Sequence, residues 1–143
     1  MKSLILAAGL FMAALTTKTF ANDVKVTPVV MQTFETNFNN ATNVKWSVVD
    51  RLYKAEFNVD GEQSAAFFSI EDGSLVASTR YITISELPST LRSSLKSHTA
   101  TATVLEMFEV EHNEGIDYYV TIQQDGKAVV LKSAASKWDV FKK

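Results

Sequence analysis

Hydrophobic and polar residues alternate along several short stretches of this chain. In residues 53–59 every second residue is apolar and the residues between them are polar. Successive side chains of a strand point to opposite faces, so this pattern predicts a strand with one buried face and one wet face. Two more apolar runs follow, and Asp-Gly pairs at 60–61 and 72–73 separate the three runs. Because Asp-Gly accepts the positive φ of tight hairpin turns, residues 44–79 are predicted to form an antiparallel meander.

Two other stretches have the spacing of amphipathic helices. Thr27-Pro28 and Leu87-Pro88 each place a proline where the first turn of a helix tolerates its missing N–H. Each predicted helix has one apolar stripe, formed by Met31, Phe34 and Phe38 in the first and by Leu87, Leu91 and Leu95 in the second. Three further strands, at about 104–111, 116–123 and 127–132, follow the second helix, with a third Asp-Gly turn at 125–126.

The order helix, then antiparallel strands, occurs twice. A shift of 60 residues places Pro28 on Pro88, and a shift of 65 places Asp60-Gly61 on Asp125-Gly126. We therefore expect an α+β fold of two repeats, at about 27–82 and 85–133. These tandem helix-plus-antiparallel-meander units would form one extended antiparallel sheet with both helices on one face. The alternative is that two unrelated helix-plus-hairpin segments align this well by chance.

The N-terminus has the pattern of a signal peptide. Lys2 precedes an uncharged apolar run from Leu4 to Leu15, and Thr19-Phe20-Ala21 offers small residues at both key positions of a cleavage site. The run is shorter than the ~20 residues that cross a bilayer. We expect cleavage after Ala21 and a single domain at 22–143, periplasmic or secreted, with no membrane span after cleavage.

Charge and cysteine content exclude several classes of partner and chemistry. The chain has 14 basic and 16 acidic residues and no cysteine. Without the signal peptide, which holds Lys2 and Lys18, the net charge is near −4, so nucleic acid is not an expected partner. The absence of cysteine removes disulfides, thiol catalysis and thiolate metal sites.

The motifs of the meander are similar to those of a known family. The matching residues are Phe34, Phe38-Asn39-Asn40-Ala41, Asn43-Val44-Lys45-Trp46, Tyr53-x-Ala55-x-Phe57, Gly61, Ala66-x-Phe68 and Asp72-Gly73. Together they resemble the PepSY-like family, also described as beta-lactamase-inhibitor-protein-like, of small exported proteins from Bacteroidetes-type bacteria. Asn39 stands where that family has a proline, and His98-Thr99 replace an aromatic residue and a proline in the second half. The resemblance implies two helix-plus-sheet units and suggests binding or inhibition of another protein, with no catalytic residues attached.

Catalytic and metal-binding patterns are weak in this sequence. His98 and His112 are its only histidines, and His112 lies in a turn rich in Glu and Asp. That turn could hold a cation, but its acidic residues also alternate as outward-facing strand positions should. Serine-hydrolase elbows and phosphate-binding glycine loops are absent from the sequence. We therefore predict a protein that is not an enzyme, with no cofactor and no metal.

The aromatic residues supply the candidate binding site. Most lie on the apolar phase of their strands, but Phe67 and Tyr119 lie on the opposite phase. Since a helix covers only one face of a sheet, we expect both side chains on the open face, where exposed aromatics can anchor a partner. Cross-strand packing with neighbouring side chains is the alternative role for them.

These observations favour an exported binding module. We expect it to engage a protein or peptide of the cell envelope through the open face of its sheet, with inhibition as one form of such binding. The alternative is a sensor that binds a small ligand or cell-wall fragment between the two repeats. The sequence leaves the oligomeric state open.

Overall fold

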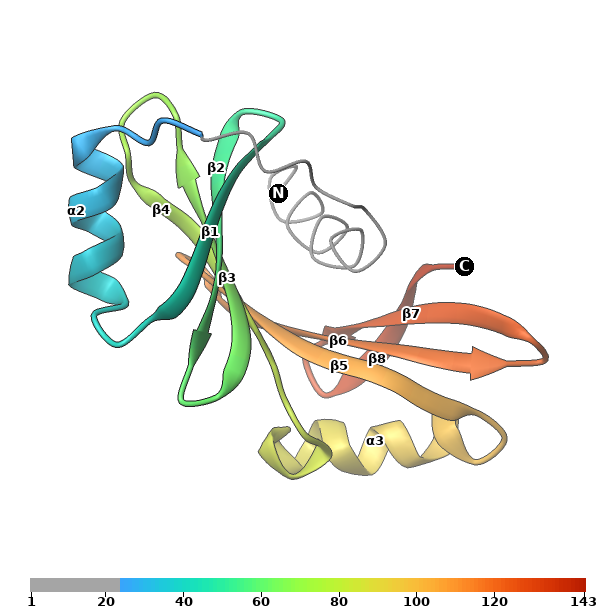
Figure 1. Cartoon of the computed structure of the whole chain (residues 1–143). Helices are drawn as coiled ribbons and strands as arrows, with labels where there is room; N and C mark the ends of the chain where they lie inside the picture. The colour runs from blue at the N-terminus through green and yellow to red at the C-terminus, as the bar shows by residue number, and fades with distance from the viewer. Residues whose placement is uncertain (1–23) are drawn as a thin grey trace. The chain divides into compact units, whose positions relative to one another are not determined.

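The structure, a computed structural model, describes residues 24–143, and the predicted signal peptide lies outside that range. Its elements are α2 (Pro28–Asn37), β1 (Thr42–Val49), β2 (Leu52–Val59), β3 (Glu62–Ser69), β4 (Leu75–Tyr81), the 3-10 helix η1 (Ile84–Glu86), α3 (Ser89–Thr99), β5 (Thr103–His112), β6 (Gly115–Gln124), β7 (Lys127–Ala134) and β8 (Lys137–Lys142) (Figure 1). The strands neighbour one another in the order β1 to β8 in one sheet, which confirms the α+β class.

The described residues divide into two compact units. Unit 1 holds the chain up to Arg80 together with Glu111–Glu114, and unit 2 holds Tyr81–Val110 and Gly115–Lys143. Each unit combines one α-helix with antiparallel strands. That the two units are copies of one repeat, with both helices on one face, stays a prediction.

Two of the three Asp-Gly turns form as the sequence predicts. Asp60 and Gly61 have φ of 51° and 85°, and Asp125 and Gly126 have φ of 52° and 75°. Each pair is the whole loop of a hairpin, as expected for turns that need positive φ at both central residues. The pair at 72–73 is different, because it belongs to a longer loop in which the Gly73 N–H donates to the Ser69 carbonyl at 2.9 Å.

The core of unit 1 is organised around Phe34 of α2. Thr27 caps this helix by accepting a hydrogen bond from the Val30 N–H at 3.4 Å, with Pro28 in the first turn. A ten-residue helix is marginal alone in water, so its packing must stabilise it. The Phe34 ring lies 5.1 Å from Phe57 and 5.3 Å from Trp46, both edge-on. Buried Val30, rather than the predicted Met31, is the second helix residue in this core.

The core of unit 2 lies between α3 and strands β5–β8. The predicted stripe Leu87, Leu91 and Leu95 is buried there, at 0–3% exposure. Trp138 of β8 packs in the same core and donates its indole N–H to the Leu91 carbonyl at 2.9 Å. The pattern of the sequence predicts a last strand that ends at Lys132, and this prediction is wrong: residues 137–142 form β8, an edge strand.

Candidate binding surfaces

Among residues 24–143, no helix packs on one face of the unit 1 sheet, and Phe67 lies on this helix-free face. Lys54, Phe67 and Ala77 are direct cross-strand partners on β2, β3 and β4, and Lys54 and Phe67 alternate with residues that pack in the core with α2. The predicted face of Phe67 is therefore correct, but its predicted exposure is wrong. The Phe67 side chain is 0% exposed in the full 143-residue chain, so its surface does not meet solvent there.

The face of β2 that the sequence predicts to be exposed to solvent is also partly buried. Lys54 is 3% exposed, and its Nζ lies 3.1 Å from Oε1 of Glu56, which pairs with it along the strand. A buried ammonium requires such a partner, because an unpaired buried charge costs several kcal/mol. The alternation of polar and apolar residues thus identified the two faces without identifying which face meets water.

On the helix-free face of unit 2, Tyr119 forms the centre of an aromatic cluster. Its ring stacks on Phe108 at 5.2 Å and 8°, and Phe141 meets it edge-on at 5.3 Å. The Nζ of Lys132 lies 5.7 Å from the ring centroid, within reach of a cation–π contact. Tyr119 is 0% exposed, so here too the predicted exposure is wrong. Phe108 and Phe141 each contact part of its ring.

The Tyr119 hydroxyl is unusual for a buried polar group. It makes no hydrogen bond of standard geometry among residues 24–143, although the Lys132 ammonium is near enough to interact with it and most buried polar atoms are paired. Burial raises the pKa of Tyr119 above its ordinary value, and the Lys132 ammonium acts in the opposite direction. The neutral phenol is therefore the form that the fold accommodates.

Charged side chains surround this aromatic cluster. The Lys132 ammonium pairs with the Asp117 carboxylate at 3.3 Å, and both side chains keep 23–29% of their surface exposed. Burial acts to lower the pKa of Lys132, but its interactions with Tyr119 and with the Asp117 carboxylate outweigh burial and leave the pKa raised. Nearby, Glu106 accepts hydrogen bonds from the Tyr81 and Thr121 hydroxyls at 3.5 and 3.3 Å.

We call the half-exposed members of this set the Tyr119 rim; they are Glu106, Asp117, Lys132 and Phe141. Sequence reasoning named Tyr119 and missed these residues. The signal that could have found Lys132 is the Asp125-Gly126 turn, because a two-residue loop that pairs Gln124 with Lys127 must pair Tyr119 with Lys132.

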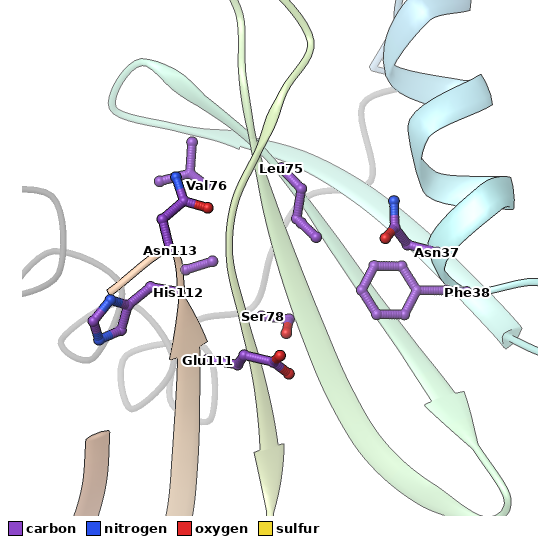
Figure 2. A pocket seen from close by; sticks show the side chains of 9 residues that line it. Asn37, Phe38, Leu75, Val76, Ser78, Glu111, His112 and Asn113 are labelled. Carbon is purple, nitrogen blue, oxygen red and sulfur yellow. The ribbon is translucent and has the colours of Figure 1, made fainter. Parts of the chain in front are cut away.

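A separate pocket of about 250 Å³ lies within unit 1 (Figure 2). Phe38 at the end of α2 and Leu75 of β4 supply apolar walls, and Glu111, His112 and Asn113 supply polar groups. The Glu114 N–H donates to Nδ1 of His112 at 3.2 Å, which leaves Nε2 as the protonated nitrogen of the neutral ring. The pocket offers donors and acceptors beside an aromatic wall.

The acidic turn around His112 does not form a metal centre in the described part of the chain. No group of three or more His, Asp or Glu side chains is placed there to hold a metal ion. His98 lies in the last turn of α3, apart from the His112 turn in the sequence. Within residues 24–143, no helix is long and apolar enough to cross a membrane.

Comparison with solved structures shows which fold this is. A BLIP-like protein of Bacteroides fragilis superposes with a TM-score of 0.71 at 17% identity, over 84% of this chain and 89% of that one. The chain has the BLIP-like fold. A DUF2874 family protein of Bacteroides ovatus has a TM-score of 0.70 at 22% identity, over 83% of this chain and 87% of its own.

A third structure, described as a candidate periplasmic protein of Bacteroides eggerthii, has a TM-score of 0.73 at 15% identity, over 83% of this chain and 88% of its own. At such identities the likeness to the BLIP-like proteins concerns the fold. No protein-family model and no curated protein matches the chain. The solved structures thus support the beta-lactamase-inhibitor-protein-like fold that the resemblance implies. Membership in the PepSY-like family stays a prediction.

Proposed function

We propose that this chain is an exported, non-enzymatic binding module that engages a protein or peptide of the cell envelope through the helix-free face of its sheet. The observation that carries the proposal is the Tyr119 rim. It combines a cation, two carboxylates and an aromatic edge above a ring stack that is already ordered. Such a preorganised surface loses little side-chain entropy when a partner binds.

Because Phe67 and Tyr119 are buried, the role proposed for them differs from the one expected from the sequence. We expected Phe67 and Tyr119 to anchor the partner, and both are fully buried. In the revised proposal Tyr119 supports the surface from beneath, and Lys132, Asp117 and Phe141 make the contacts. Aromatic residues such as Phe141 are enriched at the centres of interfaces, and a charged pair such as Lys132 and Asp117 contributes mainly to partner choice and to the rate of association.

The BLIP-like fold supports a protein partner, because the structural neighbour from Bacteroides fragilis is named as similar to an inhibitor of another protein. The candidate periplasmic neighbour supports export, as does the signal-peptide pattern with its predicted cleavage after Ala21. Inhibition of the partner, two tandem repeats and a PepSY-like ancestry are parts of the same proposal.

The experiment that tests this function is affinity capture from the envelope fraction of the encoding bacterium, followed by titration of the purified candidate partner. The informative variant is Lys132→Glu, which reverses the charge at the centre of the rim. Lys96→Glu, on the exposed side of α3, makes the same change in net charge and serves as the control. We expect Lys132→Glu to weaken binding at least tenfold and Lys96→Glu to leave it within about twofold. Equal binding by both variants would exclude this face.

A second candidate function is suggested by the pocket in Figure 2, which could hold a small polar ligand or cell-wall fragment. This pocket lies within unit 1, whereas the sequence analysis expected a ligand between the repeats. A thermal-shift screen of muropeptides tests it. A rise in melting temperature that Glu111→Gln removes and Glu114→Gln preserves would favour the sensor over the protein-binding module.

A further inference from the structure

The edge strand β1 has backbone groups that no other strand of residues 24–143 uses. In the order of the described strands β1 has β2 as its only neighbour. A two-residue turn joins them and pairs Val49 with Leu52, so this closing pair is hydrogen-bonded. Bonded and non-bonded pairs alternate along an antiparallel ladder. Trp46 and Val48 are therefore the non-bonded positions, and their N–H and C=O groups point away from β2.

An apolar groove runs beside this edge. It lies between α2 and β1, has a volume of about 350 Å³, and is lined by the side chains of Met31, Phe34, Phe38 and Trp46 among others. Phe34 fixes its floor, because its ring lies 5.3 Å from Trp46 and 5.5 Å from Phe38. Val44, at 36% exposure, extends the apolar surface along the strand.

An extended peptide that lies along β1 would reach both the groove and the outward-pointing backbone groups of the strand. A strand added to β1 would have every second side chain on the face that carries Trp46 and α2. Those side chains would enter the groove while the peptide backbone bonds to Trp46 and Val48. This combination of main-chain pairing and alternate side-chain pockets is the β-augmentation mode of peptide recognition.

The irregular start of β1 limits how long such a peptide can be. Asn43 has φ of 54°, and the register shifts between Thr42 and Lys45. A bulge with a nearby lysine is a device that prevents open-ended sheet growth. The regular edge from Lys45 to Val49 remains, which suits a short segment better than a long strand from another sheet.

Charge at the groove favours a basic ligand. Glu35 lines the groove, is exposed, and has no ion-pair partner among the described residues. The last turn of α2 carries no basic residue, so the partial negative charge of its C-terminus is not compensated there. A cation on the peptide would meet both.

We propose that α2 and the edge of β1 bind an extended peptide segment in which an apolar side chain fills the groove. A Lys or Arg two positions along, on the same face, pairs with Glu35. This site uses the helix-covered side of unit 1, so it is independent of the helix-free face in the proposed function and stands if that function fails.

The probe is the capped peptide Ser-Thr-Phe-Thr-Lys-Thr-Ser with a fluorescein label, measured by fluorescence anisotropy against the purified protein. We expect a dissociation constant on the order of 10–100 μM, as for a weak and short interface. Two isomeric versions of the probe each carry two backbone N-methyl groups. The first is methylated at Phe and Lys, and the second is methylated at the first and third Thr, which lie on the other set of alternate residues. Because only alternate N–H groups face β1, one isomer should lose binding at least tenfold and the other should stay within about threefold.

Charge swapping locates the site. Glu35→Lys should weaken the probe roughly three- to tenfold, and a probe with Glu in place of Lys should recover that loss on the variant. Glu71→Lys, an exposed loop change of equal charge, is the control. No binding at about 1 mM probe, equal effects of the two methylated isomers, or no recovery by the swapped pair would each overturn the proposal. So would a protein dimer that the probe cannot dissociate and that Val48→Pro abolishes, since a second copy would then occupy the edge.

Discussion

Replacing Tyr119 with phenylalanine removes a single oxygen atom from the centre of unit 2. The ring stack on Phe108 and the edge contact with Phe141 do not depend on that atom. The hydroxyl itself is buried without a hydrogen bond of standard geometry among residues 24–143. A buried unsatisfied polar group costs about 1–3 kcal/mol. We therefore expect Tyr119→Phe to raise the free energy of unfolding by about 1 kcal/mol, the opposite sign from most core substitutions.

The assay is urea denaturation followed by circular dichroism, with the melting temperature as a second measure. For a domain of this size about 1 kcal/mol corresponds to roughly 3–6 °C. Tyr53→Phe is the control, because Tyr53 is half-exposed and its change should stay within about 0.5 kcal/mol. Tyr119→Ala, which also deletes the ring, should cost about 3–5 kcal/mol. A loss of stability above about 0.5 kcal/mol in Tyr119→Phe would show that the hydroxyl is bonded in the fold.

Three further predictions concern the same structural features. Phe67→Ala should lower the free energy of unfolding by about 3–5 kcal/mol, because the side chain is 0% exposed. An unchanged urea midpoint would instead support the exposed side chain that the sequence predicts. Gly73→Ala should lower the free energy of unfolding by about 1–3 kcal/mol, since the φ of Gly73 is +74° and a Cβ would lie 2.7 Å from Cγ1 of Val29. Adding Val29→Ala should recover only the part of this loss that comes from the steric contact. Full recovery of the stability would mean that the positive φ contributes nothing. In an absorbance titration of the tyrosines, one group should ionise above the ordinary pKa of 10 and vanish in Tyr119→Phe. Its raised pKa contributes stability that is complete below pH 10 and is lost as the pH rises through the folded-state pKa.

Local chemistry was sufficient for much of unit 1. The Thr27-Pro28 helix start, the Asp60-Gly61 turn and the alternation in β2 were all correctly predicted, because each depends on residues that are neighbours in sequence. A Pro fixes its own φ, an Asp-Gly pair accepts its own positive φ, and strand periodicity is a property of the strand itself. The Asp72-Gly73 pair shows the limit of this approach. Its loop is longer than two residues, and part of the requirement for glycine there comes from Val29 of a helix more than 40 residues earlier.

The binding surface was less predictable than the fold. The sequence placed Phe67 and Tyr119 on the face opposite the helices, and the structure agrees about the face but not about exposure. Strand β8 was missed as well, since the position of Trp138 depends on its packing in the core and on its hydrogen bond to the distant Leu91. Both failures concern contacts between residues far apart along the chain.

The sequence by itself determined the class of fold, the positions of the hairpins, the phase of each strand and the absence of thiol chemistry. The tertiary structure alone decided which of the two phases meets water, which side chains surround Tyr119, and that a groove lies beside the free edge of β1. The physical reason is that periodicity specifies the direction of a side chain, whereas burial depends on what packs against it, and that is set by residues far away in the sequence.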